Sequence, residues 1–122
     1  MTQTRLKSLK QGIAILKAAT AEGDGGPFSV EFIPDTPGVY FMQSSTGGPI
    51  KIGQTDNLEK RTNAHIVNAP VELVVKAYIE HDEPRKLEKR LHQYFRHKRI
   101  RGEWFDITAP DLLAGVKACI DN

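Results

Sequence analysis

The stretch GVYFMQSSTGGPIKIGQ, residues 38–54, decides the fold. Residues 38–43 are rich in the aromatic and β-branched side chains that favour strands, and residues 50–54 are a second strand candidate. The loop between them contains two adjacent glycines and a proline, which are typical of a turn. The stretch therefore predicts a β-hairpin at the centre of the domain.

A helix is expected directly after this hairpin, because Thr55 or Asp56 can cap a first turn there. The helix should run to about residue 67, since Ala69 precedes a proline and such residues avoid the helical region. Residues 71–79 then alternate loosely between apolar and polar side chains, which predicts a third strand.

Two further helices are expected towards the C-terminus. Asp82 is the candidate cap of the first, and Leu87 and Leu91 belong to its apolar stripe. Residues 104–107 are expected to form a short extended segment, and Thr108 is the candidate cap of the last helix. Strands paired mainly as a meander, with helices packed on them, predict an α+β domain with a three-stranded, mainly antiparallel sheet.

The composition is that of one globular domain with a single core. The chain has 122 residues, of which 39% are hydrophobic and 26% charged. No apolar run approaches the roughly 18 residues that span a bilayer, so a membrane partner is not expected. The single cysteine, Cys119, excludes an internal disulfide and fits a reducing cytoplasm.

Basic residues are concentrated in the segment 85–101, which has eight Lys or Arg residues and one acid, Glu88. Such a cluster is typical of a surface that binds a phosphate backbone, and a solvated helix face is the alternative. An isolated acid among cations adds little to solubility, which favours backbone binding. The residues expected to contact a nucleic acid are Arg85, Lys89, Arg96, Lys98, Arg99 and Arg101.

Four side chains suit the cleavage of a phosphodiester: Tyr40, Lys51, Arg61 and Glu88. Cations placed in advance stabilise the charge that develops on phosphorus, and a guanidinium can donate two hydrogen bonds to phosphate oxygens. A glutamate can hold Mg²⁺, which keeps several waters and takes other ligands from the substrate. A free tyrosine titrates near 10, so it needs a nearby cation to act as a base at neutral pH. Lys51 could supply that charge, because its isoleucine neighbours would point to the other face of the strand.

The spacing of these residues resembles the GIY-YIG nuclease superfamily. Gly38-Val39-Tyr40 stands for its first triplet and Lys51-Ile52-Gly53 for its second, and the run continues to Arg61. The match covers about residues 31–107. The resemblance implies a small GIY-YIG-like domain.

Two further segments carry the same resemblance. The run LEKRLH at residues 87–92, with GEWF at 102–105, is similar to the branch found in phages and in meiotically up-regulated fungal proteins. The opening IPDTPGVYFM, residues 33–42, is similar to the incision domain of the excision-repair nuclease UvrC.

The resemblance implies a role for each residue that matches. Tyr40 would help to activate the attacking water, Arg61 would contact the scissile phosphate, and Glu88 would hold a single Mg²⁺ or Mn²⁺ ion. His65, one helical turn beyond Arg61, matches a histidine that several members place at the site. Asn57 falls at a familiar helix start, where a local capping role is expected.

Lys51 is the main departure from the family pattern, because the second triplet usually begins with tyrosine. Three roles are open for Lys51: contact with phosphate, activation of Tyr40, or acceptance of a proton if its amine is desolvated. His92 and Glu103 are further candidates for the metal site, with surface or structural roles as the alternatives.

Together these residues predict a metal-dependent DNA endonuclease, and the alternative is a DNA-binding module that keeps the fold without cutting. Residues 28–122 are expected to form the nuclease domain, preceded by a helix and a glycine-rich linker in residues 1–27. That helix could pack on the core, contact DNA or form a homodimer, with packing as the default. A third interpretation makes it a protein-interaction surface. Target recognition is expected to be weak or to come from a partner.

Overall fold

The predicted hairpin forms the centre of the structure. The computed structural model describes residues 33–120, so the helix and linker expected within residues 1–27 lie outside the described range. β1 (Gly38–Ser44) and β2 (Ile50–Thr55) pair antiparallel. β3 (Leu73–Glu80), the expected third strand, pairs antiparallel with the other side of β1.

The sheet has five strands within the described residues, so the expectation of three strands is wrong. The strand order is β3-β1-β2-β5-β4, with antiparallel neighbours throughout. β5 (Trp104–Phe105) belongs to the expected extended segment and pairs with β2, while β4 (Arg99–Arg101) pairs with β5. β4 escaped prediction because its three residues are all exposed and two are arginines, so no apolar alternation marks it.

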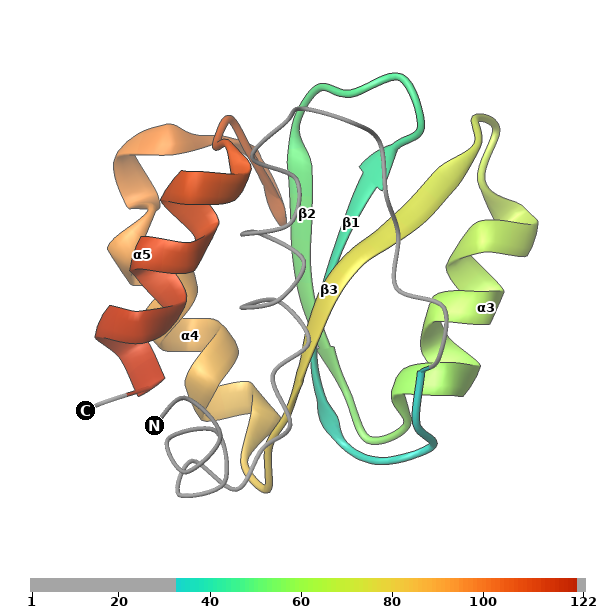
Figure 1. Cartoon of the computed structure of the whole chain (residues 1–122), viewed down its shortest axis with the longest axis horizontal. Helices are drawn as coiled ribbons and strands as arrows, with labels where there is room; N and C mark the ends of the chain where they lie inside the picture. The colour runs from blue at the N-terminus through green and yellow to red at the C-terminus, as the bar shows by residue number, and fades with distance from the viewer. Residues whose placement is uncertain (1–32, 121–122) are drawn as a thin grey trace.

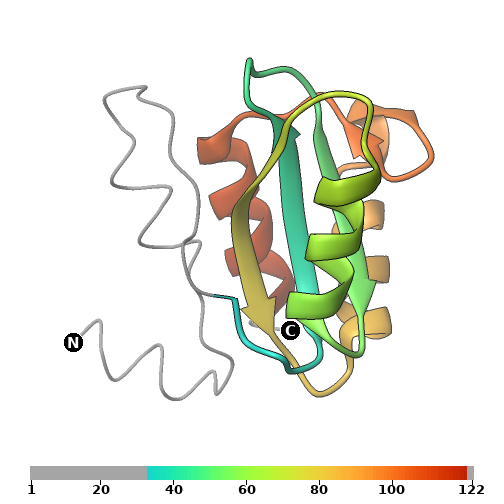
Figure 2. The same cartoon turned by 90° about the vertical axis from the view of Figure 1, so that its right-hand side faces the viewer.

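Helices cover both faces of this sheet (Figure 1). α3 (Leu58–Asn68) lies on one face, and α4 (Pro84–Tyr94) and α5 (Ala109–Ile120) lie on the other. Figure 2 shows the sheet between α3 in front and α5 behind. The short helix η2 (Arg96–Lys98) connects α4 to β4. None of the described helices is long and apolar enough to cross a bilayer.

Asn57 caps α3, which confirms its expected role and makes the expectation of a Thr55 or Asp56 cap wrong. The Asn57 Oδ1 accepts a hydrogen bond from the Lys60 N–H at 2.9 Å. The Thr55 Oγ1 instead accepts from the Asn57 N–H at 3.1 Å. The two bonds fix the chain as it leaves β2 and enters α3.

The starts of α4 and α5 differ in how they are capped. The N-cap of α4 is Glu83, without a side-chain hydrogen bond, so the expected cap at Asp82 is wrong by one residue. Pro84 explains the shift, because its fixed φ suits the first helical position and it has no N–H to be capped. Thr108 caps α5 as expected: its Oγ1 accepts from the Asp111 N–H at 3.3 Å, and Asp111 Oδ2 accepts from the Thr108 N–H at 3.0 Å.

The core has one part on each face of the sheet. Val39 and Phe41 pack with α4 and α5, whereas Tyr40 and Met42 pack with α3. A β-bulge opposite Phe41 and Met42 shifts the register of β3, so its two ends contribute to different parts of the core. Cys119 is a buried free thiol on the α5 side, as expected of a small core residue.

Candidate functional site

The site lies along the edge of β2 that faces away from β1. β5 pairs with β2 only at Ile50 and Lys51, so no described strand pairs with this edge from Ile52 onwards, and it is called the open edge of β2. The Ile52 N–H donates to the Glu103 carbonyl at 2.9 Å, and the Ile52 carbonyl accepts from His92 Nε2 at 3.0 Å. This edge therefore brings together the sheet, α4 and the turn between β4 and β5.

Tyr40 and His65 form a hydrogen-bonded pair on the α3 side of the sheet. The Tyr40 hydroxyl lies 2.9 Å from His65 Nε2, and the two ring centroids are 5.5 Å apart. Tyr40 is buried, and its hydroxyl also interacts with the Arg61 side chain. Burial raises the pKa of Tyr40, while the hydrogen bond with Arg61 opposes that rise. Tyr40 is therefore a neutral phenol at physiological pH.

His65 is suited to accept a hydrogen bond from this phenol. Burial, followed by the charges of Lys51 and Arg61, lowers the pKa of His65 below its ordinary value. In the tautomer that carries its proton on Nδ1, a neutral His65 accepts a hydrogen bond at Nε2 from the Tyr40 O–H. The phenol thus has a proton acceptor and a cation in contact with the same oxygen.

The glycines of both triplets are required by close contacts. A Cβ atom on Gly53 would overlap the hydroxyl and ring of Tyr40, which lies opposite on β1. A Cβ atom on Gly38 would overlap the Ile79 carbonyl of β3. Gly53 therefore leaves the space in which the Tyr40 ring lies across β2, and Gly38 allows β1 to pack closely against β3.

Lys51 lies on the same face of β2 as the Tyr40 ring. Its ammonium is 3.6 Å from Glu103 Oε1 and 5.8 Å from the centroid of the Trp104 ring. Ile50 and Ile52 are buried in the opposite part of the core, which confirms the expected alternation along β2. Lys51 is thus a cation held by an acid and an aromatic ring beside the Tyr40–His65 pair.

Glu88 brings a buried carboxyl from α4 to the same edge. Its Oε2 is inaccessible to solvent and has no hydrogen-bond partner among the described residues; His92 Nε2 is 3.8 Å away. Burial raises the pKa of Glu88 to about 7, helped by the like charge of Glu103 and opposed by Arg85 and Lys51. A carboxyl in this setting gains strongly from a cation.

His92 fixes the geometry between α4 and β2. Its Nε2–H donates to the Ile52 carbonyl, so Nδ1 is left to accept from Arg99 Nη2 at 3.2 Å. The His92 ring also packs against Phe105, with centroids 4.9 Å apart. These contacts give His92 a structural role at the open edge, whether or not it touches a metal.

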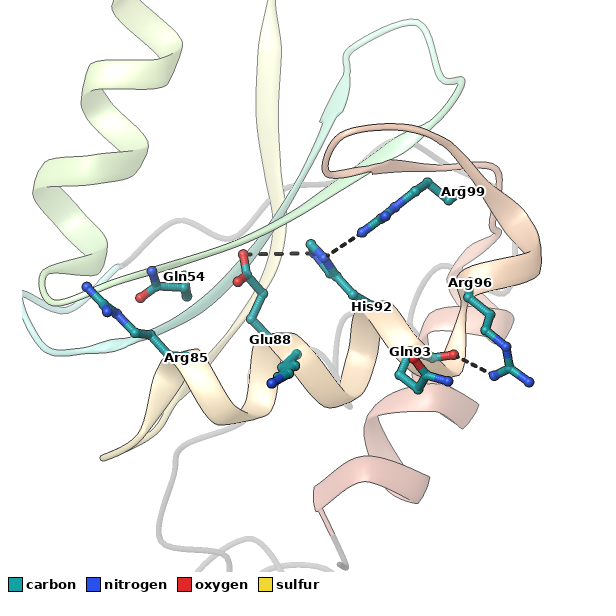
Figure 3. Close-up of a pocket in the computed structure, with 8 residues that line it drawn as sticks. Gln54, Arg85, Glu88, His92, Gln93, Arg96 and Arg99 are labelled. Atoms are coloured by element: carbon teal, nitrogen blue, oxygen red, sulfur yellow. Dashed lines mark hydrogen bonds and ion pairs between the residues drawn. The ribbon is translucent and has the colours of Figure 1, made fainter.

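A polar cavity of about 500 Å³ lies beside Glu88 (Figure 3). In that view Glu88 and His92 project from α4 towards β2, and Gln54 lies across from Arg85. Four of the six predicted nucleic-acid contacts line the cavity, and the other two, Lys98 and Arg101, are exposed outside it. The complete lining is Gln54, Arg85, Glu88, Lys89, His92, Gln93, Arg96 and Arg99.

The structure brings the five predicted catalytic residues to one region of the fold. Electrostatic interactions link Tyr40 with Arg61 and Glu88, and Lys51 with His65 and Glu88. Their catalytic roles stay predictions. No group of three or more His, Cys, Asp or Glu side chains in residues 33–120 is arranged to hold a metal ion. An ion here would therefore depend on one or two carboxylates.

Glu103 is the residue that the prediction undervalued. It pairs with Lys51 and perturbs Glu88, so it belongs to the centre of the site. Its signal in the sequence was the GEWF run, but its position depends on the β4–β5 hairpin, which was not predicted. Gln54 and Gln93 were also missed, because nothing in the sequence indicated a cavity beside them.

Comparison with known proteins gives a family for most of the chain. The T5orf172 domain matches residues 38–121, which include both triplets, Glu88 and α5. No curated protein and no solved structure matches the chain significantly. The matched region covers more than half of the 122 residues. The chain therefore belongs to the T5orf172 domain family, which is found in phage-type and other nuclease-associated proteins.

Proposed function

We propose that this chain is a metal-dependent endonuclease that hydrolyses DNA phosphodiester bonds through a GIY-YIG-like site. One observation carries the proposal: the buried, unpartnered carboxyl oxygen of Glu88 reaches the open edge of β2, where Tyr40, His65, Arg61 and Lys51 converge. Membership of a nuclease-associated family supports it.

The proton chemistry begins at Tyr40. In its neutral form the phenol is hydrogen-bonded to a neutral His65, so the phenolic proton can move to His65 Nε2 as Tyr40 takes a proton from water. Arg61, which bonds the same hydroxyl, stabilises the phenolate character that develops during this transfer. Hydroxide then attacks phosphorus in line with the leaving oxygen.

Two cations can stabilise the negative charge that develops on the phosphate. Arg61 is exposed beyond its contact with Tyr40 and can donate a second hydrogen bond to a phosphate oxygen. Lys51 is held by Glu103 as an ion pair, so we assign it contact with phosphate ahead of proton transfer. Both charges are in place before the reaction, which is the condition for effective electrostatic stabilisation.

The residues fit a hard divalent cation. Glu88 offers a buried oxygen without a hydrogen-bond partner among the described residues, and the Glu103 carboxyl is its neighbour. Mg²⁺ or Mn²⁺ keeps several waters and needs few protein ligands, which agrees with a site of two carboxylates. Such an ion, when bound, would neutralise charge on the phosphate and the leaving oxygen. Glu88 would hold it, and Glu103 would bind it directly or through a water.

Nicking of supercoiled plasmid in Mg²⁺ or Mn²⁺ tests this proposal. Wild type should nick DNA, while Glu88→Gln and Tyr40→Phe should lose at least about 100-fold in rate, the scale of general acid–base and electrostatic contributions. The matched controls are Glu72→Gln, an exposed glutamate before β3, and Tyr78→Phe, which lies opposite Tyr40 on β3. Equal nicking by wild type and Glu88→Gln would contradict catalysis.

A DNA-binding module without cleavage is the alternative function. Lys51 at the usual tyrosine position and its pairing with Glu103 favour this alternative. It predicts salt-dependent DNA affinity that falls on Arg61→Ala, with no cleavage in any divalent metal. Cytoplasmic location, and a recognition partner or homodimer through residues 1–27, also remain proposals.

A further inference from the structure

The cavity beside Glu88 has the size of a small-ligand site. Its volume of about 500 Å³ lies within the range of roughly 300–1,000 Å³ that is usual for such sites. Its walls come from β2, α4, η2 and β4, so elements distant in sequence shape one space (Figure 3). The space is open to solvent on one side, so a nucleotide can enter it from the surface.

The charge of the cavity favours an anionic ligand. Arg85, Lys89, Arg96 and Arg99 line it, and no salt bridge joins any of them to a carboxylate within residues 33–120. Arg96 Nη1 donates to the Gln93 carbonyl at 2.9 Å and Arg99 Nη2 contacts His92, so each guanidinium is positioned by one N–H group. The remaining N–H groups can bind phosphate, and the guanidinium planes can stack on a base.

Two side-chain amides give the cavity both hydrogen-bond donors and acceptors, and a site for phosphate alone needs only donors. Gln54 and Gln93 line the cavity, and their amides make no hydrogen bond with another described residue. An amide presents a donor and an acceptor together, which matches the edge of a nucleobase. Phosphate oxygens, by contrast, only accept.

We propose that this cavity binds one nucleotide of the substrate strand, phosphate and base, turned out of the base stack beside the scissile phosphate. The inference rests on the proposed function, because Glu88 borders both the cavity and the catalytic residues. The arginines and Lys89 hold the phosphate, and Gln54 and Gln93 hydrogen-bond the base. A paired base must first lose its pairing and stacking, so the site favours DNA with an unpaired nucleotide.

The test compares two DNA duplexes of equal length, one fully paired and one with a single unpaired nucleotide. Binding is measured by fluorescence anisotropy in EDTA, so cleavage plays no part. Wild type should bind the duplex with the unpaired nucleotide at least about tenfold more tightly, because its base does not have to lose a pairing partner before it enters the cavity. Replacing the unpaired base with 2-aminopurine should give a rise in its emission on binding, as expected of an unstacked base.

Three variants separate base binding from phosphate binding. Gln93→Ala, and the double change Gln54→Ala with Gln93→Ala, should abolish the preference and leave affinity for paired DNA within about twofold of wild type. Arg96→Gln should weaken binding to both duplexes. Gln43→Ala is the matched control, because its amide binds the Gly48 carbonyl in the β1–β2 loop, outside the cavity. Far-UV circular dichroism establishes that each variant is folded.

Equal affinity of wild type for the two duplexes would overturn the proposal and leave a phosphate-only groove. Persistence of the preference in the folded double variant would overturn it as well. Failure of the nuclease proposal looks different: DNA binding with its preference intact but no cleavage in Mg²⁺ or Mn²⁺. The binding assay therefore tests the nucleotide site, and the cleavage assay tests the nuclease proposal, independently of each other.

Discussion

Glu88 has a carboxyl whose ionisation is linked to any cation that it binds. Burial and the neighbouring Glu103 raise its pKa to about 7, so a metal must compete with a proton near neutrality. The sequence marked Glu88 as the one acid in a basic run. Its burial was not predictable, because Glu103 reaches it from the β4–β5 turn and His92 draws α4 onto the edge of β2.

The first prediction at this scale concerns metal affinity and pH. Affinity for Mn²⁺ should be nearly constant above the Glu88 pKa of about 7 and fall by up to about tenfold per pH unit below it, because one proton is released on binding. Isothermal titration calorimetry at pH values on both sides of 7, in buffers of different ionisation enthalpy, measures the Mn²⁺ affinity and the number of protons released. Affinity independent of pH, or unchanged in Glu88→Gln, would contradict a role for Glu88 as ligand.

The second prediction concerns the stability of the metal-free protein. The pKa of Glu88 is about 7 when folded and 4.5 in the reference state, so stability is fully present below 4.5 and falls as the pH rises through 7. Glu88→Gln removes the desolvated charge and should raise Tm by a few degrees at about pH 8, with little change at about pH 4. Thermal melts in EDTA measure this, with Glu72→Gln as control. A lower Tm for Glu88→Gln at the higher pH would contradict the burial of this charge.

At the scale of elements, β2 determines the site because only part of its edge is paired. Its pairing with β5 ends at Lys51, so no described strand pairs with this edge from Ile52 to Thr55, and α4 lies beside it. The hairpin, β3 and the three described α-helices were predictable, because the pattern of apolar and turn residues that indicates each of them lies within or beside its own segment. β4 was not, since its stability comes from pairing with β5 rather than from its own side chains.

Gly53→Ala tests the packing of Tyr40 across β2. A Cβ atom would overlap the Tyr40 hydroxyl and ring, so this substitution should displace the ring and reduce nicking at least about 100-fold, with about 1–3 kcal/mol of destabilisation. Ile52→Val is the control, because it removes a methylene from the opposite core at about 1 kcal/mol and should retain nicking. Gly53→Ala with wild-type activity would show that the position of Tyr40 is not critical.

At the scale of the whole molecule, the cations form one surface along α4, η2 and β4. This surface borders the open edge of β2, so a bound strand can pass from the cavity to Tyr40 and Arg61. The basic run was visible in the sequence, and the structure divides it: four members line the cavity, while Lys98 and Arg101 lie outside it. Which of these cations line the cavity depends on the path of the chain after α4, and no local sequence pattern predicts that path.

DNA affinity should depend on salt through these cations. The double substitution Arg85→Gln with Arg96→Gln should reduce the slope of log affinity against log salt by up to about 2, because about 0.9 is lost for each phosphate contact removed. Lys117→Gln, on the exposed side of α5, should leave the slope unchanged. The slopes are measured by anisotropy titrations in EDTA. Equal slopes for all proteins would place the DNA elsewhere.

Glu88 is proposed to hold a divalent metal facing Tyr40 at the open edge of β2. Anomalous diffraction from crystals soaked in Mn²⁺ tests it most directly. One peak is expected beside Glu88 Oε2, within reach of the Glu103 carboxyl, and no such peak in Glu88→Gln crystals. Absence of a peak at Glu88 at a Mn²⁺ concentration that supports nicking, or a peak that persists in Glu88→Gln, would contradict the claim.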